Sequence, residues 1–241
     1  MVGSIDEPAG LTRPSGAALL DNPAWAALTG PQSRFAQRVG NALRFHPDIG
    51  PIAALPTDPT DADWSDAAEL VGPGGSLLLF AVSTIPPQGW TASMDLPGVQ
   101  MVGNDVTGRP DDAAVRLTAD DVPEMIDLVR RARPGPFGNR TIELGTYLGI
   151  RRDGRLIAMA GERLGLPGHT EISAVCTEPG FRGRGLASRL VLALVQCIRD
   201  RGKTPILYAD GRNVTAIRLY QDLGFVVRRE AMFRMVTAPS A

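Results

Sequence analysis

The stretch PGFRGRGLASRL, residues 179–190, places three glycines and two arginines within six residues, directly before an apolar helical pattern. Phosphate oxygens are best held by several backbone N–H groups that converge at the start of a helix, where the helix dipole adds favourable potential. Gly183 and Gly185 leave room for such an approach. Arg182 and Arg184 supply fixed positive charge. The loop therefore predicts a phosphate or pyrophosphate site, against the alternative of a glycine-rich turn with solvated arginines.

Two common phosphate-binding loops do not match this stretch. A Walker loop ends in Gly-Lys-Ser/Thr, and the only lysine of the chain is Lys203, which lies elsewhere. A dinucleotide fingerprint, Gly-x-Gly-x-x-Gly, opens the first helix of a parallel βαβ unit, whereas here the pattern reads GRGLAS and follows a predicted β-hairpin array. The loop therefore favours a different type of phosphate-binding fold.

The elements that must position this loop predict a mixed α/β domain. Asp153-Gly154 is the strongest short hairpin signal of the chain. Thr118 or Asp120 before Glu124 is an N-cap signature for a helix. The predicted elements are a strand and a helix within 114–135, three strands within 146–164 and 169–179, a helix at 186–202, a strand at 204–210, a helix at 213–224 and a strand at 225–236. This order, with antiparallel hairpins in its middle, indicates a mixed sheet.

The first half predicts a small α/β unit without a catalytic constellation. Residues 1–20, rich in Gly, Pro, Ser and Ala, are expected to be an irregular lead. The polar stretch GNDVTGRPDD at 103–112 is the predicted domain boundary. The elements expected before it are helices at 22–31 and 61–75, two extended segments within 42–56 and a buried strand at 76–82. We therefore divide the chain into a lead at 1–20, an accessory α/β domain at 21–110 and a second domain at 113–238.

Composition excludes several classes of function. The longest purely apolar stretch, residues 77–82, is far shorter than the roughly 20 residues of a membrane span, and no signal-peptide pattern is present. We therefore expect a cytoplasmic protein that does not contact a membrane. The two cysteines and two histidines lack metal-ligand spacing, so no metal site is expected.

Charge is unevenly distributed along the chain. Residues 1–112 carry 5 arginines against 13 acidic residues, or −8, and residues 113–241 carry 20 basic against 13 acidic residues, or +7. A basic second half suggests an anionic ligand, with solvated arginines as the alternative. No aromatic-interleaved basic patch, zinc-finger spacing or RNP-like motif is present, so we expect no nucleic-acid partner.

At the glycine loop the sequence resembles the GNAT superfamily of N-acetyltransferases. Arg182-Gly183-Arg184-Gly185-Leu186-Ala187 matches the family signature Arg/Gln-x-x-Gly-x-Gly/Ala, and residues 213–225 read N-x-x-A-x-x-L-Y-x-x-L-G-F in the family's order. The likeness covers residues 113–236, about half of the chain. It implies an acyl-CoA N-acyltransferase fold with a mixed α+β sheet. The preceding smaller α/β domain is interpreted as an accessory domain or as a degenerate copy of the same fold.

The resemblance also implies that acetyl-CoA is the co-substrate. The loop amides would hold its pyrophosphate, and the pantetheine arm would pair like an additional strand with the backbone just before the loop. The implied cofactor-binding residues are Val175, Cys176, Thr177, Arg182, Gly183, Arg184, Gly185, Ala187, Ser188 and Asn213.

Three residues are candidates for the chemistry. Tyr220 lies two helical turns after Asn213, and in similar enzymes a tyrosine here protonates the CoA sulfur; a role as an aromatic core residue is the alternative. Glu171 lies eleven residues before Arg182, where histone-type members carry a catalytic carboxylate. Glu162 on the neighbouring strand is the other candidate base, and a chain of waters is a third route. A strand glutamate that is exposed or paired with Arg163 is the structural alternative. Cys176 is interpreted as a small buried hydrophobe rather than a nucleophile, because neither histidine is placed to activate it.

The sequence thus predicts an N-acetyltransferase that moves an acetyl group from acetyl-CoA to a primary amine by direct attack in a ternary complex. The acceptor is expected to be a small-molecule or peptide amine. A non-catalytic acyl-CoA-binding regulatory module is the alternative, and it would bind CoA without turnover. The identity of the acceptor, the acyl chain length and the formation of a homodimer stay open at this point.

Overall fold

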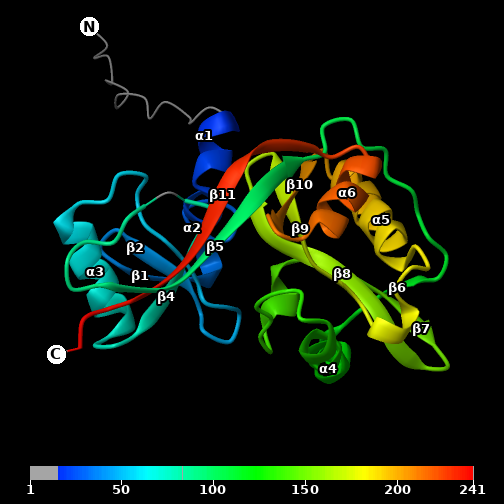
Figure 1. Cartoon of the computed structure of the whole chain (residues 1–241), viewed down its shortest axis with the longest axis horizontal. Coiled ribbons are helices and arrows are strands. Elements are labelled where there is room, and N and C mark those ends of the chain that lie inside the picture. The colour runs from blue at the N-terminus through cyan, green and yellow to red at the C-terminus, as the bar shows by residue number, and fades with distance from the viewer. Residues whose placement is uncertain (1–15, 83, 241) are drawn as a thin grey trace, which may run out of the picture.

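One continuous eleven-stranded sheet forms the framework of the protein (Figure 1). The computed structural model describes residues 16–82 and 84–240. The strands lie in the order β1-β2-β3-β4-β11-β5-β10-β9-β8-β7-β6. Their bounds are β1 Ala36–Val39, β2 Ala42–Phe45, β3 Ile52–Ala54, β4 Ser76–Phe80, β5 Thr91–Val102, β6 Ala114–Arg116, β7 Tyr147–Arg152, β8 Arg155–Leu166, β9 His169–Thr177, β10 Thr204–Asp210 and β11 Val226–Thr237.

Helices cover the sheet and enclose its apolar clusters. The α-helices are α1 Gly16–Asp21, α2 Pro23–Leu28, α3 Asp61–Val71, α4 Val122–Ala132, α5 Leu186–Asp200 and α6 Val214–Asp222. Short 3-10 turns are η1 Ser33–Phe35, η2 Ala119–Asp121, η3 Thr141–Leu144 and η4 Pro179–Phe181. α5 and α6 enclose one cluster with β7 to β10, α4 encloses a second around Tyr147 and Met159, and α2 packs at the junction of the two halves. Apolar residues recur every three or four positions along α4 and α5, which gives each helix one apolar face that packs on the sheet.

The two halves repeat one topology. β1, β2 and β3 form an antiparallel meander, α3 crosses over, and β4 lies parallel to β3. β7, β8 and β9 form the same meander, α5 crosses over, and β10 lies parallel to β9. The first half is thus built like a shortened copy of the second, which was one of the two interpretations of this region.

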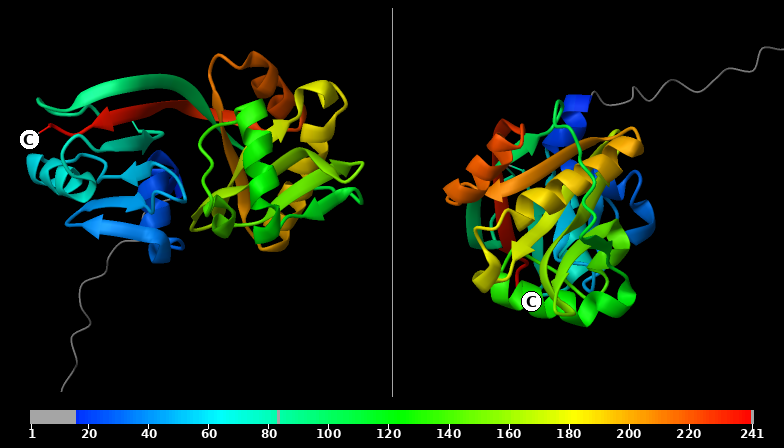
Figure 2. Two further views of the ribbon diagram at one scale, coloured as in Figure 1. Left: turned by 90° about the horizontal axis from the view of Figure 1, so that it is seen from below. Right: turned by 90° about the vertical axis from the view of Figure 1, so that its right-hand side faces the viewer.

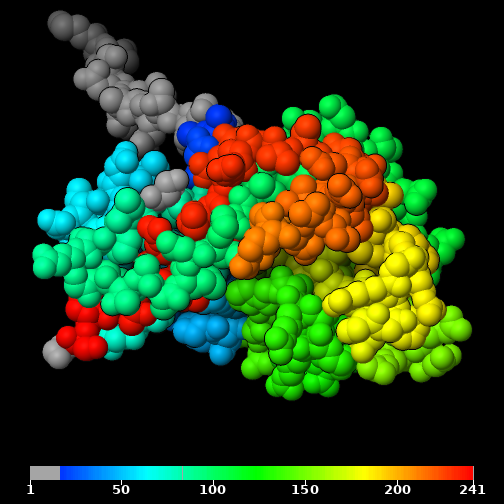
Figure 3. Space-filling view, viewed as in Figure 1, coloured from blue at the N-terminus to red at the C-terminus, as the bar shows by residue number. Residues whose placement is uncertain are grey.

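The last strand of each half pairs with the other half. β5 of the first half pairs with β10, and β11 of the second half pairs with β4. β5 and β11 also pair with each other from Val226↔Val102 to Thr237↔Thr91, and Figure 2 shows the two ribbons running side by side from one lobe to the other. In Figure 3 red C-terminal atoms correspondingly lie both beside the orange atoms of one lobe and at the far end of the other. The predicted boundary at 103–112 is the connection between β5 and β6, and the sheet is continuous on both sides of it.

The fold class predicted from the sequence, a mixed α/β sheet, is confirmed. The hairpin at Asp153-Gly154 is present, with positive φ at both residues. Three features differ from the expectation. β1 lies between two predicted elements and was not predicted. Residues 16–20, which were included in the irregular lead, are helical, and residues 1–15 lie outside the described part. β5 was not predicted, because Pro97 and Gly98 interrupt its strand pattern and its first residues are exposed.

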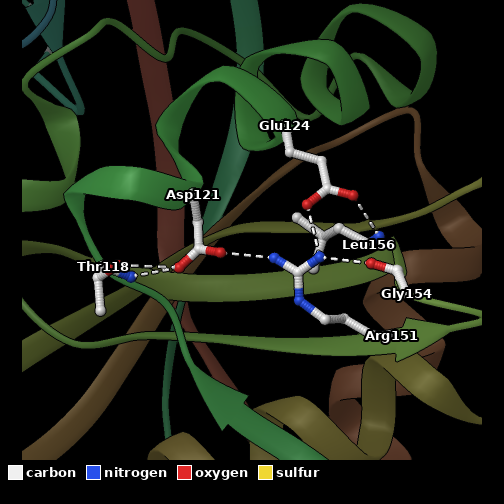
Figure 4. A network of polar contacts seen from close by, with 6 residues as sticks. All are labelled: Thr118, Asp121, Glu124, Arg151, Gly154 and Leu156. Carbon is white, nitrogen blue, oxygen red and sulfur yellow. Dashed lines mark hydrogen bonds and ion pairs between the residues drawn. The ribbon is translucent and has the colours of Figure 1, made fainter.

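A charged network fixes α4 against the β7–β8 hairpin (Figure 4). The Arg151 guanidinium donates to Asp121 Oδ1 at 2.5 Å, to Glu124 Oε2 at 2.6 Å and to the Gly154 carbonyl at 2.8 Å. The other Glu124 oxygen accepts from the Leu156 N–H at 2.7 Å. The Arg151 guanidinium donates hydrogen bonds to α4, to the preceding turn η2 and to the β7–β8 hairpin. The network therefore fixes the position of α4 over the sheet.

Candidate active site

The glycine loop presents a row of unused backbone donors at the start of α5. Gly183 and Gly185 have φ of +74° and +73°, a region that side chains disfavour, and Gly185 caps the helix without a side-chain bond. The backbone N–H groups of residues 183–188 make no hydrogen bond to any described residue. Six free amides at a helix N-terminus match the requirements for binding a pyrophosphate. The residues at these positions include Ala187 and Ser188 of the predicted set.

The two loop arginines stay close to the loop and carry uncompensated charge. Arg182 Nε donates to the Thr177 carbonyl at 3.4 Å, and the Arg184 guanidinium lies 5.1 Å from the centre of the Phe181 ring. Neither arginine forms an ion pair within the described part of the chain, and both are exposed. Their positive charge is therefore available to an anion at the loop.

β9 and β10 separate just before the loop. Their last paired residues are Ile172 and Leu207. Ala174 then adopts φ +52°, and the register between β8 and β9 shifts at the same point, so β9 contains a bulge. Beyond it, Cys176 and Thr177 pair with β8 alone, and the edge of β9 that faces β10 has no strand partner among the described residues.

This open edge is where the sequence placed the arm of the cofactor. Val175, Cys176 and Thr177 are all extended backbone beyond the bulge. A free strand edge offers N–H and C=O groups to an extended ligand in the manner of an added strand. The Cys176 side chain packs with Leu117 and Met125 on the α4 side of the sheet, and burial raises the pKa of its thiol to about 12. Such a thiol is protonated at neutral pH, which disfavours a nucleophilic role.

Tyr220 lies beside this opening, on α6. It is 8% exposed and packs in one cluster with Leu186 at the start of α5 and Ala209 on the separated part of β10. Its ring meets Phe225 edge-on at 6.2 Å. Its hydroxyl has no hydrogen-bond partner within the described residues, and burial raises its pKa to about 12. The phenol is thus a protonated, unengaged donor.

Asn213 begins the same helix. Its Oδ1 accepts a hydrogen bond from the Ala216 N–H at 3.1 Å, which makes Asn213 the N-cap of α6. The residue is exposed, and its amide N–H groups have no partner among the described residues. Asn213 therefore has a structural role in the fold and still offers two donors to a ligand.

Glu171 is engaged in a buried ion pair. Its carboxylate accepts from Arg163 Nη2 at 2.5 Å and from Arg163 Nε at 3.1 Å, and also from the Leu164 N–H at 3.2 Å. The Glu171 side chain is 1% exposed, and the Arg163 guanidinium stacks on the Phe80 ring of the first half. Both oxygens are thus already used, which is an unfavourable arrangement for a general base.

Glu162 lies on the opposite face of the sheet, under the end of α5. Its Oε1 accepts from Arg201 Nη2 at 2.5 Å and its Oε2 from the Thr146 N–H at 3.3 Å. The predicted cofactor loop is at the other end of α5, about 20 Å away for a helix of 15 residues. The structure does not bring Glu162 together with the loop and Tyr220.

A polar group that the sequence did not single out lies on the separated part of β10. Tyr208 directly follows the last paired residue, and its hydroxyl accepts from Gln100 Nε2 of β5 at 2.6 Å. Arg228 of β11 donates to the other end of Gln100 at 2.8 Å. Sequence inspection could not find this group, because β5 and β10 are about a hundred residues apart and their pairing has no local signal.

The corresponding region of the first half lacks the features of the loop. Between β3 and α3 the chain reads LPTDPT, without glycine or arginine. Thr60 and Asp63 close the start of α3 with a capping box, in which Asp63 accepts from the Thr60 N–H at 2.7 Å. The N–H groups of Thr60 and Asp63 are used there and the local charge is negative, so this helix start lacks the features that the loop at 179–190 offers to a phosphate.

Neither a membrane-crossing helix nor a metal cluster is found in the part of the chain that the structure describes. None of its helices is long and apolar enough to span a bilayer. No group of three His, Cys, Asp or Glu side chains lies close enough together to hold a metal ion there.

Comparison with known proteins agrees with the architecture. The model of the FR47-like protein family matches residues 147–234. A crystal structure of a GNAT-family protein from Novosphingobium aromaticivorans DSM 12444 is 37% identical, with a TM-score of 0.84, and the match covers 92% of this chain and 99% of that one. A GCN5-related N-acetyltransferase from Kribbella flavida shares the fold at 20% identity and a TM-score of 0.64.

Curated relatives are similar over shorter regions. A mycothiol acetyltransferase of Nocardiopsis dassonvillei is 28% identical over 196 residues, 61% of this chain. That match spans 58% of the relative's own length. The N-alpha-acetyltransferase RimI of Mycobacterium tuberculosis is 33% identical over 84 residues, which is 33% of this chain and 51% of that protein.

A mixed sheet that opens beside a glycine-rich helix start matches the fold of the GNAT acyltransferases. The chain belongs to the GNAT family of acetyltransferases. The family resemblance predicted from residues 182–187 and 213–225 is thereby confirmed.

Proposed function

We propose that this enzyme transfers the acetyl group of acetyl-CoA to a primary amine by direct attack within a ternary complex. The observation that carries the proposal is the separation of β9 from β10 after Ile172 and Leu207, directly before six free amides at the start of α5. The amides and Arg182 and Arg184 suit a pyrophosphate, and the open edge of β9 suits an extended arm. Acetyl-CoA is the usual donor of GNAT acetyltransferases, and these residues fit it.

The chemistry follows from what lies at the opening. The amine nitrogen forms a bond to the thioester carbonyl carbon, and the carbon–sulfur bond then breaks. The leaving thiolate takes the proton of the Tyr220 hydroxyl, which is protonated and free, and solvent returns a proton to the phenolate. Polarisation of the carbonyl is assigned to backbone N–H groups at the bulge of β9.

The proton lost by the amine goes to solvent in this proposal. Glu171 is held at both oxygens by Arg163, and Glu162 faces the far end of α5. Neither carboxylate has a free oxygen near Tyr220. In this proposal neither of the two glutamates considered from the sequence acts as the base. The third route is retained, in which water accepts the proton.

The acceptor approaches from the side of the first half in this proposal. Tyr208, Gln100 and Arg228 place polar groups there, next to the separated strands. The names of the relatives, mycothiol acetyltransferase and N-alpha-acetyltransferase, favour a small-molecule or peptide amine as the acceptor.

Thermal unfolding with acetyl-CoA, CoA and ADP tests the cofactor site. We expect saturable stabilisation of the wild type by acetyl-CoA and its loss in Gly185→Glu. Gly202→Glu is the matched control, because Gly202 has a similar φ of +68° and equally open surroundings but lies at the other end of α5. Absence of stabilisation at millimolar acetyl-CoA, or its persistence in Gly185→Glu, would reject the site.

Release of free thiol in the presence of an amine panel then tests turnover. Stabilisation by acetyl-CoA together with amine-dependent thiol release is the expected result. Stabilisation without release for any amine, on a chain that keeps Tyr220, would instead favour the non-catalytic acyl-CoA-binding module.

A further inference from the structure

A polar cavity of about 170 Å³ lies between the two halves, away from the glycine loop. The segment from Pro31 to Phe35 forms one wall, and residues of β8, β9 and the end of α5 form the other. The cavity is smaller than the roughly 300–1,000 Å³ of sites for drug-sized molecules, so it suits a small ligand.

Two of the cationic side chains that line this cavity have no anionic partner among the described residues. Arg201 is paired with Glu162, and Arg163 is paired with Glu171. Arg34 and Lys203 form no ion pair with any described residue. The Glu143 carboxylate, which feels the charge of Arg34, is already held by Arg140 at 2.7 Å. The cavity therefore has an excess of positive charge.

Uncharged polar atoms in the wall are also unused. Gln32 is 5% exposed, and its Nε2 donates to the carbonyl of Arg163 at 2.7 Å. Its Oε1 is buried and accepts no hydrogen bond within the described structure. Thr170 is 4% exposed, and its hydroxyl likewise makes no hydrogen bond within the described structure. A buried acceptor without a donor is rare in folded proteins, and a donor group on a ligand in this cavity would satisfy it.

We propose that this cavity is a second ligand site, which binds a small organic anion bearing a hydroxyl or amino group. Arg34, Lys203 and the remaining N–H groups of Arg201 bind the acidic group. The hydroxyl or amino group of the ligand donates to Gln32 Oε1, and Thr170 Oγ1 supplies a further contact. The ligand bridges the halves, because Gln32 and Arg34 belong to the first half and Thr170, Arg201 and Lys203 to the second.

This site is separate from the acetyl-CoA site. The cavity touches the residues that follow α5, whereas the glycine loop precedes it, and a helix of 15 residues spans about 20 Å. The apolar side chains of Leu190, Leu194 and Ile198 fill the space under the helix between the two. Its occupancy is therefore expected to be independent of acetyl-CoA.

Titration calorimetry on the full chain, at saturating acetyl-CoA, tests the proposal with three probes. L-malate carries two carboxylates and a hydroxyl, succinate lacks the hydroxyl, and inorganic phosphate is the simplest anion. We expect saturable binding of malate that is tighter than that of succinate and of phosphate. Binding of the same strength in Gly185→Glu would confirm that the probe does not occupy the glycine loop.

Charge-matched variants identify the site. Arg34→Ala/Lys203→Ala is expected to weaken malate binding at least about tenfold, because hydrogen bonds to charged groups are lost. Arg130→Ala/Arg152→Ala removes two exposed arginines elsewhere and should leave binding unchanged. Neither pair of residues packs in an apolar cluster, and an unchanged midpoint of thermal unfolding verifies the fold. No saturable binding up to about 10 mM, equal binding of malate and succinate, or unchanged binding in Arg34→Ala/Lys203→Ala would overturn the proposal.

Discussion

The guanidinium of Arg163 holds both carboxylate oxygens of Glu171, at 2.5 Å and 3.1 Å. The pair lies where the first half covers the sheet, with Arg163 stacked on Phe80. Removal of one partner of a buried pair leaves an uncompensated charge and costs about 3–5 kcal/mol. We therefore expect Glu171→Gln to lower the free energy of unfolding by about 3 kcal/mol, measured by urea denaturation.

Kinetics on the same variant separate a structural role from a catalytic one. If Glu171 is structural, Glu171→Gln keeps the pH profile of kcat/KM at temperatures where it is folded. Arg163→Met/Glu171→Leu should recover part of the lost stability, since apolar residues replace the whole pair. Wild-type stability in Glu171→Gln combined with a loss of kcat would instead identify the carboxylate as the base.

Tyr220→Phe removes the proposed proton donor and little else. The hydroxyl has no partner among the described residues, so we expect stability to stay within about 0.5 kcal/mol. Loss of general acid catalysis lowers the rate by about a hundredfold or more. Thiol release at saturating acetyl-CoA measures kcat, and the thermal shift with acetyl-CoA measures binding.

Phe225→Leu is the control for packing, since Phe225 meets the Tyr220 ring and has no polar atom. It should lower stability without the loss of kcat seen in Tyr220→Phe. An unchanged kcat in Tyr220→Phe would leave Tyr220 as an aromatic core residue, the alternative reading of its position.

Much of the local geometry of this candidate site could be predicted because its signals are short-range. The free amides depend on Gly183 and Gly185 and on the helix that follows, all within one stretch of sequence. The N-cap role of Asn213 and the hairpin at Asp153-Gly154 are also short-range features.

The remaining features depend on pairing between distant segments. For Glu171 the sequence left open a role as base and a pairing with Arg163; the structure has the ion pair and adds the Phe80 ring of the first half, which packs on Arg163 and has no local signal. β5 contains Pro97 and Gly98, and it forms because β10 and β11 flank it on both sides. No residue of β5 or β11 signals that the two strands are exchanged between the halves.

The exchange of strands predicts that the halves do not fold separately. Residues 113–241 alone would lose β5, which pairs with both β10 and β11, and would expose two long unpaired edges. We expect this fragment to be aggregated or unfolded by circular dichroism. Co-expression of residues 1–102 with 103–241 should restore a soluble complex. A monomeric, folded fragment 113–241 that binds acetyl-CoA would contradict this expectation.

The Arg151 network predicts sensitivity to acid. The Thr118 N–H, followed by Arg151, lowers the pKa of Asp121. Burial opposes a lower pKa for Glu124, but the Leu156 N–H and Arg151 outweigh it. Carboxyl groups with lowered pKa stabilise the fold above their ordinary values of 3.8 and 4.5, and this stabilisation is lost as pH falls below them.

Arg151→Met should lower the free energy of unfolding at neutral pH by about 2 kcal/mol. This estimate lies between the typical contribution of an exposed ion pair and the cost of breaking a buried one. Its stability should also decline less than that of the wild type between neutral pH and the acidic range, in urea denaturation at a series of pH values. Arg130→Met, which breaks one exposed pair with Asp127, is the control and should change neither quantity. Parallel pH curves for Arg151→Met and wild type would refute this role of the network.

The three tyrosines of the chain predict a late alkaline titration. Burial raises the pKa of Tyr147, Tyr208 and Tyr220, the last to about 12. An unfolded phenol ionises near pH 10, so folding keeps these groups protonated. Their contribution to stability is complete below about pH 10 and is lost as the pH rises towards 12.

Ultraviolet absorbance should therefore show little tyrosinate until the protein unfolds, and tyrosinate and loss of circular dichroism should appear together. Tyr220→Phe should unfold at a higher pH than the wild type, because it removes one of the groups whose ionisation drives unfolding. Tyrosinate formation near pH 10 in the folded protein would show that at least one hydroxyl is in contact with solvent.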